Sequence, residues 1–383
     1  MKILFTLRFF PAFGGGEAVT LRLANALCRR GYNVYILYLW ENYAGMDVNV
    51  DDMVKTIKVR DIHLPINGFE IDKRDYAFMK SEFISIVNKY NINIVMNQWW
   101  PEKLIYGVTS AKIIKCHHTA ILVDSKRKET LRKIFGDNGY SFILKQYLKK
   151  KYKATLKLCD KFVLLSPKYI DDVRYLYGNR YNKKLYSISN PCRYDLYENC
   201  YRDKENIVIF VGRLSTEKRV ALLLDSWRLF ERKNHDWKLH IVGDGLLINS
   251  LIKYSKDIGC EKVSFLGSMD PMNELKKAKI IVMTSSYEGL PMSIIEGMNF
   301  GCVPIVMNTF SACSDIVTCG KDGILVNDSV TEFSRALVNL VSNEDMLRRM
   351  SLEASKKSAR YTIDHIIDEW IKCFSIIEEE LHG

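Results

Sequence analysis

The chain has no apolar run approaching the roughly 20 residues that a helix needs to cross a bilayer, although 48% of its 383 residues are hydrophobic. Its ten cysteines form no Cys-x-x-Cys pair, its histidines show no metal-ligand spacing, and no Gly-x-Gly-x-x-Gly run is present. These absences argue against a membrane-spanning segment, a metal site and a dinucleotide-dependent dehydrogenase. Met1 and Lys2 lead directly into an apolar strand, so we expect no signal peptide, and the cysteines suit small core positions in a reducing cytosol.

Length and charge narrow the class of protein further. A chain of 383 residues is long enough for two domains with separate cores, and a charged content of 26% is ordinary for a globular protein. The formal net charge of +11 indicates an anionic partner, which is a nucleic acid, an anionic membrane surface or a phosphorylated substrate. Nucleic acid is the least favoured of the three, because no RNA- or DNA-binding motif accompanies the charge.

The stretch from Lys279 to Val306 predicts a strand, a loop, a helix and a second strand. Ile280 to Met283 is the first buried strand, and Pro291 is suited to the first turn of the helix. Glu288 lies on the loop and Glu296 on the helix. A helix N-terminus at the carboxyl end of a parallel sheet attracts anions, so a diphosphate fits there while the carboxylates accept hydrogen bonds from sugar hydroxyls.

A solvated surface position is the alternative interpretation for both carboxylates. The apolar neighbours Ile294, Ile295 and Met298 argue against it for Glu296. For Glu288, the local sequence pattern by itself does not exclude a solvated surface position.

The segment SSYEGLPMSIIEGMNFGCVPIV resembles the E-x7-E segment of the retaining, nucleotide-sugar-dependent glycosyltransferases of family 4. This resemblance implies that Glu288 contacts the transferred sugar and that Glu296 holds the ribose, with Gly289, Leu290 and Pro291 at the donor. It also implies the GT-B fold of the α/β class. In that fold two Rossmann-like doubly wound domains face each other across a cleft, and a C-terminal helix crosses back to the first domain.

A second match to the same family lies in FVGRLSTEKR, which resembles its GRL-x-x-x-K motif. The resemblance implies that Arg213 and Lys218 bind the donor pyrophosphate, and two cations at the head of a helix suit that role. Lys218 would also fit a solvated surface. Gly243 and Gly267 end two further predicted strands and are candidate donor-binding residues, since the loop after Gly267 borders the nucleobase in this family.

The N-terminal half opens with a predicted strand, helix and strand, which indicates a doubly wound sheet. Gly15 and Gly16 lie in the first strand-to-helix loop, where glycines let backbone N–H groups approach a ligand. A plain flexible loop is the alternative, but GGGEAVTLRLANAL resembles the Gly-Gly loop of the same family, which faces the donor phosphates and the acceptor. KCHHTA resembles its strand-end histidine, which donates to a donor-sugar hydroxyl. The pattern favours His118 and leaves His117 open.

The segment 123–158 carries eleven lysines and arginines and only three acids, with aromatic residues interleaved. Such a segment suits peripheral association with an anionic membrane. A solvated helix face with an ordinary core side fits it equally well.

We therefore expect an N-terminal acceptor-binding domain (1–195), a hinge (196–206), a nucleotide-sugar-binding domain (207–360) and a crossover helix (361–383). The cysteines and the basic segment favour a cytoplasmic protein or one that is peripheral on the inner face of the cell membrane, and the resemblance implies a retaining transferase of a hexose. Its donor would be a UDP-sugar, or next a GDP-sugar, and its acceptor a glycan or lipid-linked precursor of bacterial surface polysaccharide. No Asp-x-Asp pair is present, so we predict no metal or other cofactor. A GT-B-like nucleotide-sugar 2-epimerase and a non-catalytic nucleotide-binding subunit are the alternatives.

Overall fold

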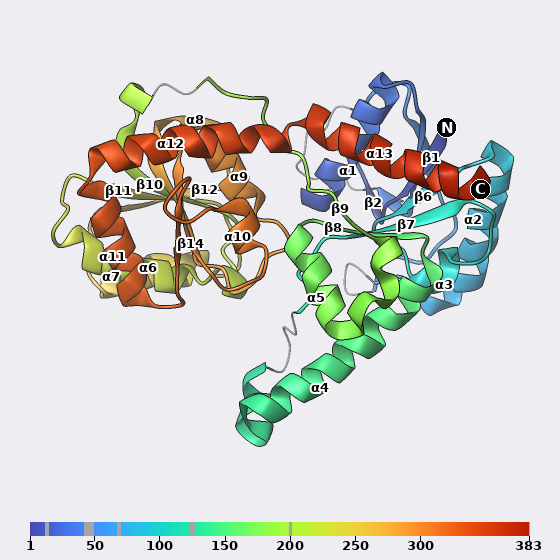
Figure 1. Ribbon diagram of the computed structural model, residues 1–383. Helices are drawn as coiled ribbons and strands as arrows, with labels where there is room; N and C mark the ends of the chain where they lie inside the picture. Colours follow the sequence, from blue (N-terminus) through green and yellow to red (C-terminus); the bar gives the residue numbers. More distant parts are fainter. Residues whose placement is uncertain (12–14, 42–49, 67–69, 123–127, 199–200, 383) are drawn as a thin grey trace. The chain divides into compact units, whose positions relative to one another are not determined.

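The computed structural model describes residues 1–11, 15–41, 50–66, 70–122, 128–198 and 201–382. It divides the chain into two compact units (Figure 1). The first contains Met1–Ser189 together with Ile363–Gly383, and the second contains Asn190–Thr362. None of the described helices is long and apolar enough to span a membrane.

In its described residues, the first unit is built on a seven-stranded parallel sheet with the order β5-β3-β1-β6-β7-β8-β9. Its strands are β1 (Lys2–Thr6), β3 (Asn33–Tyr38), β5 (Lys55–Lys58), β6 (Ile94–Asn97), β7 (Lys112–His117), β8 (Lys161–Leu164) and β9 (Leu185–Ser187). Its α-helices are α1 (Gly15–Arg29), α2 (Tyr76–Tyr90), α3 (Glu102–Ile105), α4 (Lys128–Leu158), α5 (Pro167–Tyr177) and α13 (Ile363–His382). The short strands β2 (Phe9–Phe10) and β4 (Trp40–Glu41) pair separately.

Strand β1 lies in the interior of the first sheet, between β3 and β6. Ile3, Leu4 and Phe5 of the central strand β1 are fully buried, as expected for a parallel strand covered on both faces. The chain leaves β1 toward β3 on one side and later returns to β6 on the other. The carboxyl ends of β1 and β6 therefore form the topological switch point of the sheet, where ligands bind in open α/β folds.

The C-terminal helix α13 is part of the first unit, as predicted. It packs against α1, and Trp370 and Phe374 are buried in the same apolar cluster as Leu27. Arg30 near the end of α1 pairs with Asp364 at 3.2 Å and Asp368 at 2.9 Å. These two pairs are exposed and contribute little, so the apolar stripe provides most of the stabilisation.

In its described residues, the second unit is built on a six-stranded parallel sheet with the order β12-β11-β10-β13-β14-β15. Its strands are β10 (Glu205–Val211), β11 (Lys238–Val242), β12 (Val263–Gly267), β13 (Ala278–Met283), β14 (Val303–Met307) and β15 (Ile324–Val326). Its α-helices are α6 (Val220–Glu231), α7 (Ile248–Asp257), α8 (Met272–Lys277), α9 (Met292–Asn299), α10 (Cys313–Ile316), α11 (Val330–Val341) and α12 (Glu344–Ser358).

The residues predicted to end the first domain and to form the hinge pack on the second unit. The rings of Tyr194 and Tyr197 lie 5.1 and 5.0 Å from that of Phe300. The buried Lys204 ammonium donates to the carbonyl oxygen of Ala278 at 2.6 Å. The structure therefore divides the chain after Ser189, whereas the sequence prediction placed that boundary after residue 195.

Candidate active site

The predicted donor-binding residues gather at one edge of the second unit's sheet. Strands β10, β11, β12 and β13 run parallel, so their carboxyl ends meet at that edge. The residues at or just beyond these ends are Arg213, Lys218, Gly243, Gly267, Glu288, Gly289, Leu290 and Pro291. The structure therefore brings together residues that are up to 78 positions apart, from Arg213 to Pro291, as a donor site requires.

Two of the glycines at this edge are required by the backbone itself. Gly243 has a φ of +138°, and a Cβ atom there would lie 1.9 Å from the carbonyl oxygen of Gly212. The Gly243 N–H donates to the carbonyl oxygen of Gly267 at 2.8 Å, and Gly267 has a φ of +72°. Only glycine fits the close approach at Gly243, and the left-handed backbone favours glycine at Gly267, where a Cβ would meet nothing within 4 Å. Both residues leave no side chain over the edge.

Lys218 and Glu288 form an ion pair at this edge. The ammonium nitrogen lies 2.6 Å from Oε1 of Glu288, and the two side chains are only 19% and 14% exposed. The loops that carry them are joined by backbone contacts, because the Ser286 N–H donates to the Glu217 carbonyl at 2.8 Å. The hydroxyl of Thr284 donates to the Lys218 carbonyl at 2.9 Å. The pair is therefore held on a well-connected support, and Glu288 is not a freely solvated charge.

Arg219 supports the same loop and was not predicted from the sequence. Its backbone is left-handed, with a φ of +49°, at the junction between a 3₁₀ turn and α6. Its guanidinium donates to the carbonyl oxygen of Thr284 at 2.7 Å and to both Asp328 oxygens at 2.8 and 2.7 Å. Arg213, in contrast, has an exposed side chain just after β10. Of the two arginines, only Arg213 has an exposed side chain, and its role at the donor stays a prediction.

Glu296 lies half-buried on α9, one turn beyond Pro291. The helix begins after Pro291, whose carbonyl oxygen accepts the Ile294 N–H at 3.0 Å. Burial and a hydrogen bond to Asp270 raise the pKa of Tyr194, and the nearby negative charge of Glu296 adds to the increase. The Glu296 carboxylate therefore lies near Tyr194 of the segment 190–198.

At the corresponding edge of the first unit, Gly16 is in contact with Trp99. A Cβ atom on Gly16 would lie 2.7 Å from the Trp99 ring, whereas one on Gly15 would meet nothing within 4 Å. The Trp99 indole in turn stacks on His118, with ring centroids 4.9 Å apart. Gly16, Trp99 and His118 thus form one continuous row across the ends of β1, β6 and β7. Gly14, the first glycine of the run, lies outside the described residues.

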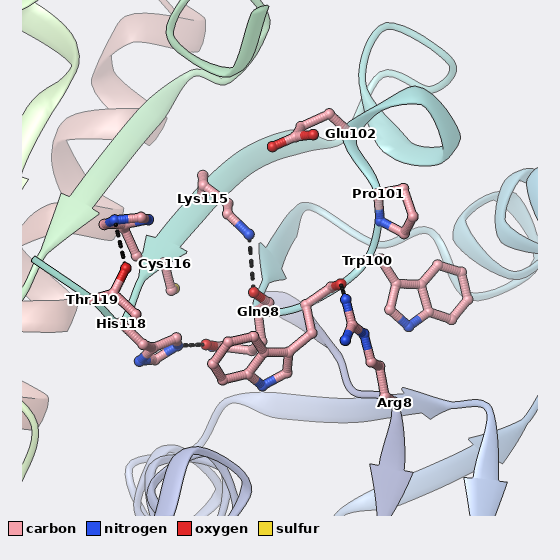
Figure 2. A pocket seen from close by; sticks show the side chains of 11 residues that line it. Arg8, Gln98, Trp100, Pro101, Glu102, Lys115, Cys116, His118 and Thr119 are labelled. Carbon is pink, nitrogen blue, oxygen red and sulfur yellow. Dashed lines mark hydrogen bonds between the residues drawn. The ribbon is translucent and has the colours of Figure 1, made fainter. Parts of the chain in front are cut away.

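The two neighbouring histidines, His117 and His118, have different contacts. Nε2 of His118 hydrogen-bonds to Oε1 of Gln98 (Figure 2). His117 instead packs against the rings of Tyr152 and Phe162, and its Nε2 lies 3.1 Å from the Thr119 hydroxyl. The structure therefore places His118, and not His117, in the row with the glycine loop.

A pocket of about 270 Å³ opens beside this row (Figure 2). Its lining comes from the ends of β1, β6 and β7 and consists of Arg8, Gln98, Trp99, Trp100, Pro101, Glu102, Lys115, Cys116, His117, His118 and Thr119. The Lys115 ammonium donates to the carbonyl oxygen of Gln98 at 2.9 Å, and burial lowers the pKa of Lys115. Burial, with the charge of Lys115, also lowers the pKa of His118 to about 3, so that imidazole is neutral at physiological pH.

Among the residues that the structure describes, no group of three or more His, Cys, Asp or Glu side chains could hold a metal ion. The polar side chains at the carboxyl ends of the strands, in the sheet of each unit, are instead cations, single carboxylates, amides and imidazoles. This set is suited to binding phosphates and sugar hydroxyls.

The two parallel α/β units, with a C-terminal helix returning to the first, define the class of protein as GT-B. The structure of a point mutant of S. aureus TarM with fondaparinux, alpha-GlcNAc-glycerol and UDP is similar, with a TM-score of 0.73 at 14% identity. That likeness covers 97% of this chain and 99% of the other. The fold predicted from the sequence is therefore confirmed.

Sequence comparison gives the family. Residues 198–357, which is nearly all of the second unit, match the family model of glycosyl transferases group 1. A Campylobacter jejuni enzyme is 26% identical over 99% of both chains. It is named GalNAc-alpha-(1->4)-GalNAc-alpha-(1->3)-diNAcBac-PP-undecaprenol alpha-1,4-N-acetyl-D-galactosaminyltransferase. The lipopolysaccharide 1,6-galactosyltransferase of Salmonella typhimurium is 31% identical over 37% of this chain and 42% of its own.

The predicted resemblance is therefore confirmed. The second unit belongs to glycosyl transferases group 1, and the chain is a glycosyltransferase. The roles of the individual site residues stay predictions.

Proposed function

We propose that the chain is a retaining glycosyltransferase that moves a hexose-type sugar from a nucleoside-diphosphate sugar to a glycan or lipid-linked acceptor. The proposed donor is a UDP-sugar, the proposed process is bacterial surface polysaccharide synthesis, and the proposed reaction needs no metal. The observation that carries the proposal is the Lys218–Glu288 ion pair at the sheet edge that also holds Arg213 and the start of α9.

The geometry of this pair suits a sugar diphosphate. An ammonium group has three N–H donors, so Lys218 can keep its contact with Glu288 and still donate to a phosphate oxygen. The Glu288 carboxylate then accepts hydrogen bonds from sugar hydroxyls. Arg213 and the N-terminus of α9 supply further positive potential for the diphosphate. We assign to Glu296, one turn into α9, the role of accepting from a ribose hydroxyl.

These residues would accelerate transfer by stabilising charge. Breaking the bond between the anomeric carbon and the diphosphate leaves negative charge on the leaving group and positive charge on the sugar ring. Donors already oriented toward the diphosphate stabilise that charge, and one such donor is typically worth about 3–4 kcal/mol. We propose a front-face route that retains the anomeric configuration. The acceptor hydroxyl attacks from the side of the leaving diphosphate, and its proton passes to a diphosphate oxygen.

The related proteins support the donor and the acceptor in this proposal. The TarM structure contains UDP, and the Campylobacter enzyme's name describes an acceptor joined to undecaprenol through a diphosphate. The Salmonella relative is a lipopolysaccharide galactosyltransferase by name. Metal independence is proposed because the sequence has no Asp-x-Asp pair.

Helix α4 supports peripheral association with an anionic membrane. A groove of about 670 Å³ lies where α4 meets the end of α5 and the turn that follows it. It is lined by the cations Lys145, Lys149, Lys150, Lys153 and Arg180 and by no described carboxylate. Phe142 and Tyr147 of α4 are 65% and 52% exposed. Lys126 and Arg127 of the predicted basic segment lie outside the described residues.

Vesicle binding tests this association. Cosedimentation of the protein with vesicles should increase with their phosphatidylglycerol content and should be lost when Lys149, Lys150 and Lys153 are replaced by glutamate.

The decisive experiment is a comparison of three Glu→Gln variants on a panel of nucleotide-sugars. Glu288→Gln should abolish transfer and leave UDP affinity nearly unchanged, whereas Glu296→Gln should weaken UDP binding. Glu205→Gln is the matched control, because Glu205 is exposed at the opposite, amino end of β10. Full activity in Glu288→Gln would contradict the mechanism. Release of an epimerised free sugar from donor alone would favour the 2-epimerase, and UDP binding without turnover of any donor would favour a non-catalytic subunit.

A further inference from the structure

Gln98 holds the imidazole of His118 in one orientation. The Gln98 side chain is buried, with 2% exposure, and its Oε1 hydrogen-bonds to Nε2 of His118 (Figure 2). A side-chain hydrogen bond also links Gln98 to the buried Cys116 thiol. A thiol sulfur can accept from the amide nitrogen, which agrees with the amide oxygen lying on the side of the histidine. The Gln98 carbonyl is fixed in addition by the Lys115 ammonium at 2.9 Å.

This contact determines the proton positions on His118. An amide oxygen can only accept, so Nε2 must carry the hydrogen. In the neutral ring, Nδ1 then has a free lone pair. Nδ1 is buried and has no hydrogen-bond partner among the described residues. A buried polar atom without a partner costs about 1–3 kcal/mol, so such atoms are retained where a ligand completes them.

Two donors on other residues that line the pocket are likewise buried without a partner in the described part of the chain. They are Nε of Arg8 and Nε1 of Trp99. The described residues that line the pocket therefore hold two unpaired N–H donors, one unpaired nitrogen acceptor and the aromatic surface of an indole. A hydroxyl group both donates and accepts, and a sugar ring carries several hydroxyls together with apolar C–H faces. Among small ligands, a monosaccharide unit matches this set.

We infer that Gln98 is a positioning residue that fixes His118 as the Nε2–H tautomer, so that Nδ1 accepts a hydrogen bond from a hydroxyl of a sugar held in this pocket. The inference rests on the proposed function and deepens it. The family resemblance predicted that the strand-end histidine donates to the sugar. The contact with Gln98 reverses that direction and makes His118 an acceptor.

The tautomer can be measured without any turnover. Imidazole ¹⁵N spectra of the ¹⁵N-histidine-labelled chain, with His118 assigned from the His118→Asn spectrum, should show the Nε2–H form alone. Gln98→Leu, which keeps the size of the side chain and removes the amide, should give a mixture of tautomers. An Nδ1–H tautomer in the wild type, or an unchanged tautomer in Gln98→Leu, would overturn the inference even if the chain transfers sugar.

Kinetic variants separate the two ring nitrogens. In His118→Asn the short amide reaches the position of Nδ1, whereas in His118→Gln the longer one reaches that of Nε2. We expect His118→Gln to lose about 10- to 100-fold in kcat/KM, the range that corresponds to one buried hydrogen bond. His118→Asn should lose clearly less. Equal losses in the two variants would contradict an acceptor role at Nδ1. The thermal melting temperature of each variant shows whether it is folded.

The pH profile provides a second test. With its pKa at about 3, His118 is neutral in the wild type, and activity should not fall through its protonation above about pH 4. In Gln98→Glu, the carboxylate beside Nε2 stabilises the imidazolium and raises that pKa. Protonation then blocks Nδ1, so kcat/KM should fall as the pH decreases through the new pKa. A Gln98→Glu profile that superimposes on the wild type would refute the role of Gln98. Absence of transfer by the wild type on every donor would instead refute the proposed function.

Discussion

Replacing Gly16 with alanine adds one carbon atom to α1 at a point where the indole of Trp99 already lies. The new Cβ would come within 2.7 Å of the Trp99 ring, whereas carbon atoms pack at about 3.5–4.0 Å. The indole must therefore move by roughly 1 Å, or the first turn of α1 must shift by as much. Because Trp99 stacks on His118 at 4.9 Å, the imidazole is displaced with it.

The magnitude follows from this overlap. Forcing an extra carbon into a packed site typically costs about 1–3 kcal/mol of stability. A shift of about 1 Å in a group that positions substrate can reduce the rate about 100-fold. We therefore expect Gly16→Ala to remain folded with a lower melting temperature. Its kcat/KM should fall about 100-fold, measured with the donor that the panel of nucleotide-sugars identifies.

Gly15→Ala is the matched control. A Cβ atom on Gly15 meets nothing within 4 Å, and alanine is favoured over glycine in a helix by up to about 1 kcal/mol. This variant should be at least as stable as the wild type, because nothing has to move; it is a control for stability alone, since the resemblance assigns Gly15 to the donor site as well. If Gly16→Ala had the same melting temperature as Gly15→Ala and the kcat/KM of the wild type, the contact between Gly16 and Trp99 would have no part in the site.

Three further predictions concern the diphosphate, the metal and the C-terminal helix. Arg213→Ala should weaken UDP binding about 10- to 100-fold by calorimetry, since a hydrogen bond to a charged group is worth about 1.5–3 kcal/mol; unchanged affinity would remove Arg213 from the diphosphate site. Turnover should be undiminished in EDTA, and a strict requirement for Mg²⁺ would show the proposal of metal independence to be wrong. Trp370→Ala should reduce the free energy of unfolding by about 3–5 kcal/mol in urea melts, because this indole is 4% exposed in the core of the first unit; a loss below about 1 kcal/mol would mean that α13 adds little to that core.

Local patterns predicted the strand-loop-helix segments well. The apolar run Ile280 to Met283 gave a buried strand, and the helix that follows starts one residue after Pro291. The buried residues Ile366, Trp370, Phe374 and Ile377 of the last helix recur at helical spacing, and that period is visible in the sequence itself. Each of these features is determined by residues that are close together in the sequence.

Contacts between distant segments could not be predicted in the same way. Lys218 and Glu288 were assigned separately to phosphate and sugar, and nothing in either motif shows that their side chains form a 2.6 Å ion pair. The contact of Gly16 with Trp99 depends on the neighbouring positions of β1 and β6 in the sheet. The left-handed Arg219 has no sequence signal, since this conformation is favoured by glycine or asparagine and not by arginine.

The path of the chain has a consequence for how the protein is made. The core of the first unit contains Ile366, Phe374 and Ile377, which come from the last helix, whereas the whole second unit lies between Asn190 and Thr362. During synthesis on the ribosome, the second unit can therefore complete its core while the first still lacks a helix. A chain that stops short of residue 363 would leave the apolar face of α1 exposed to water, which favours aggregation over release of a working enzyme.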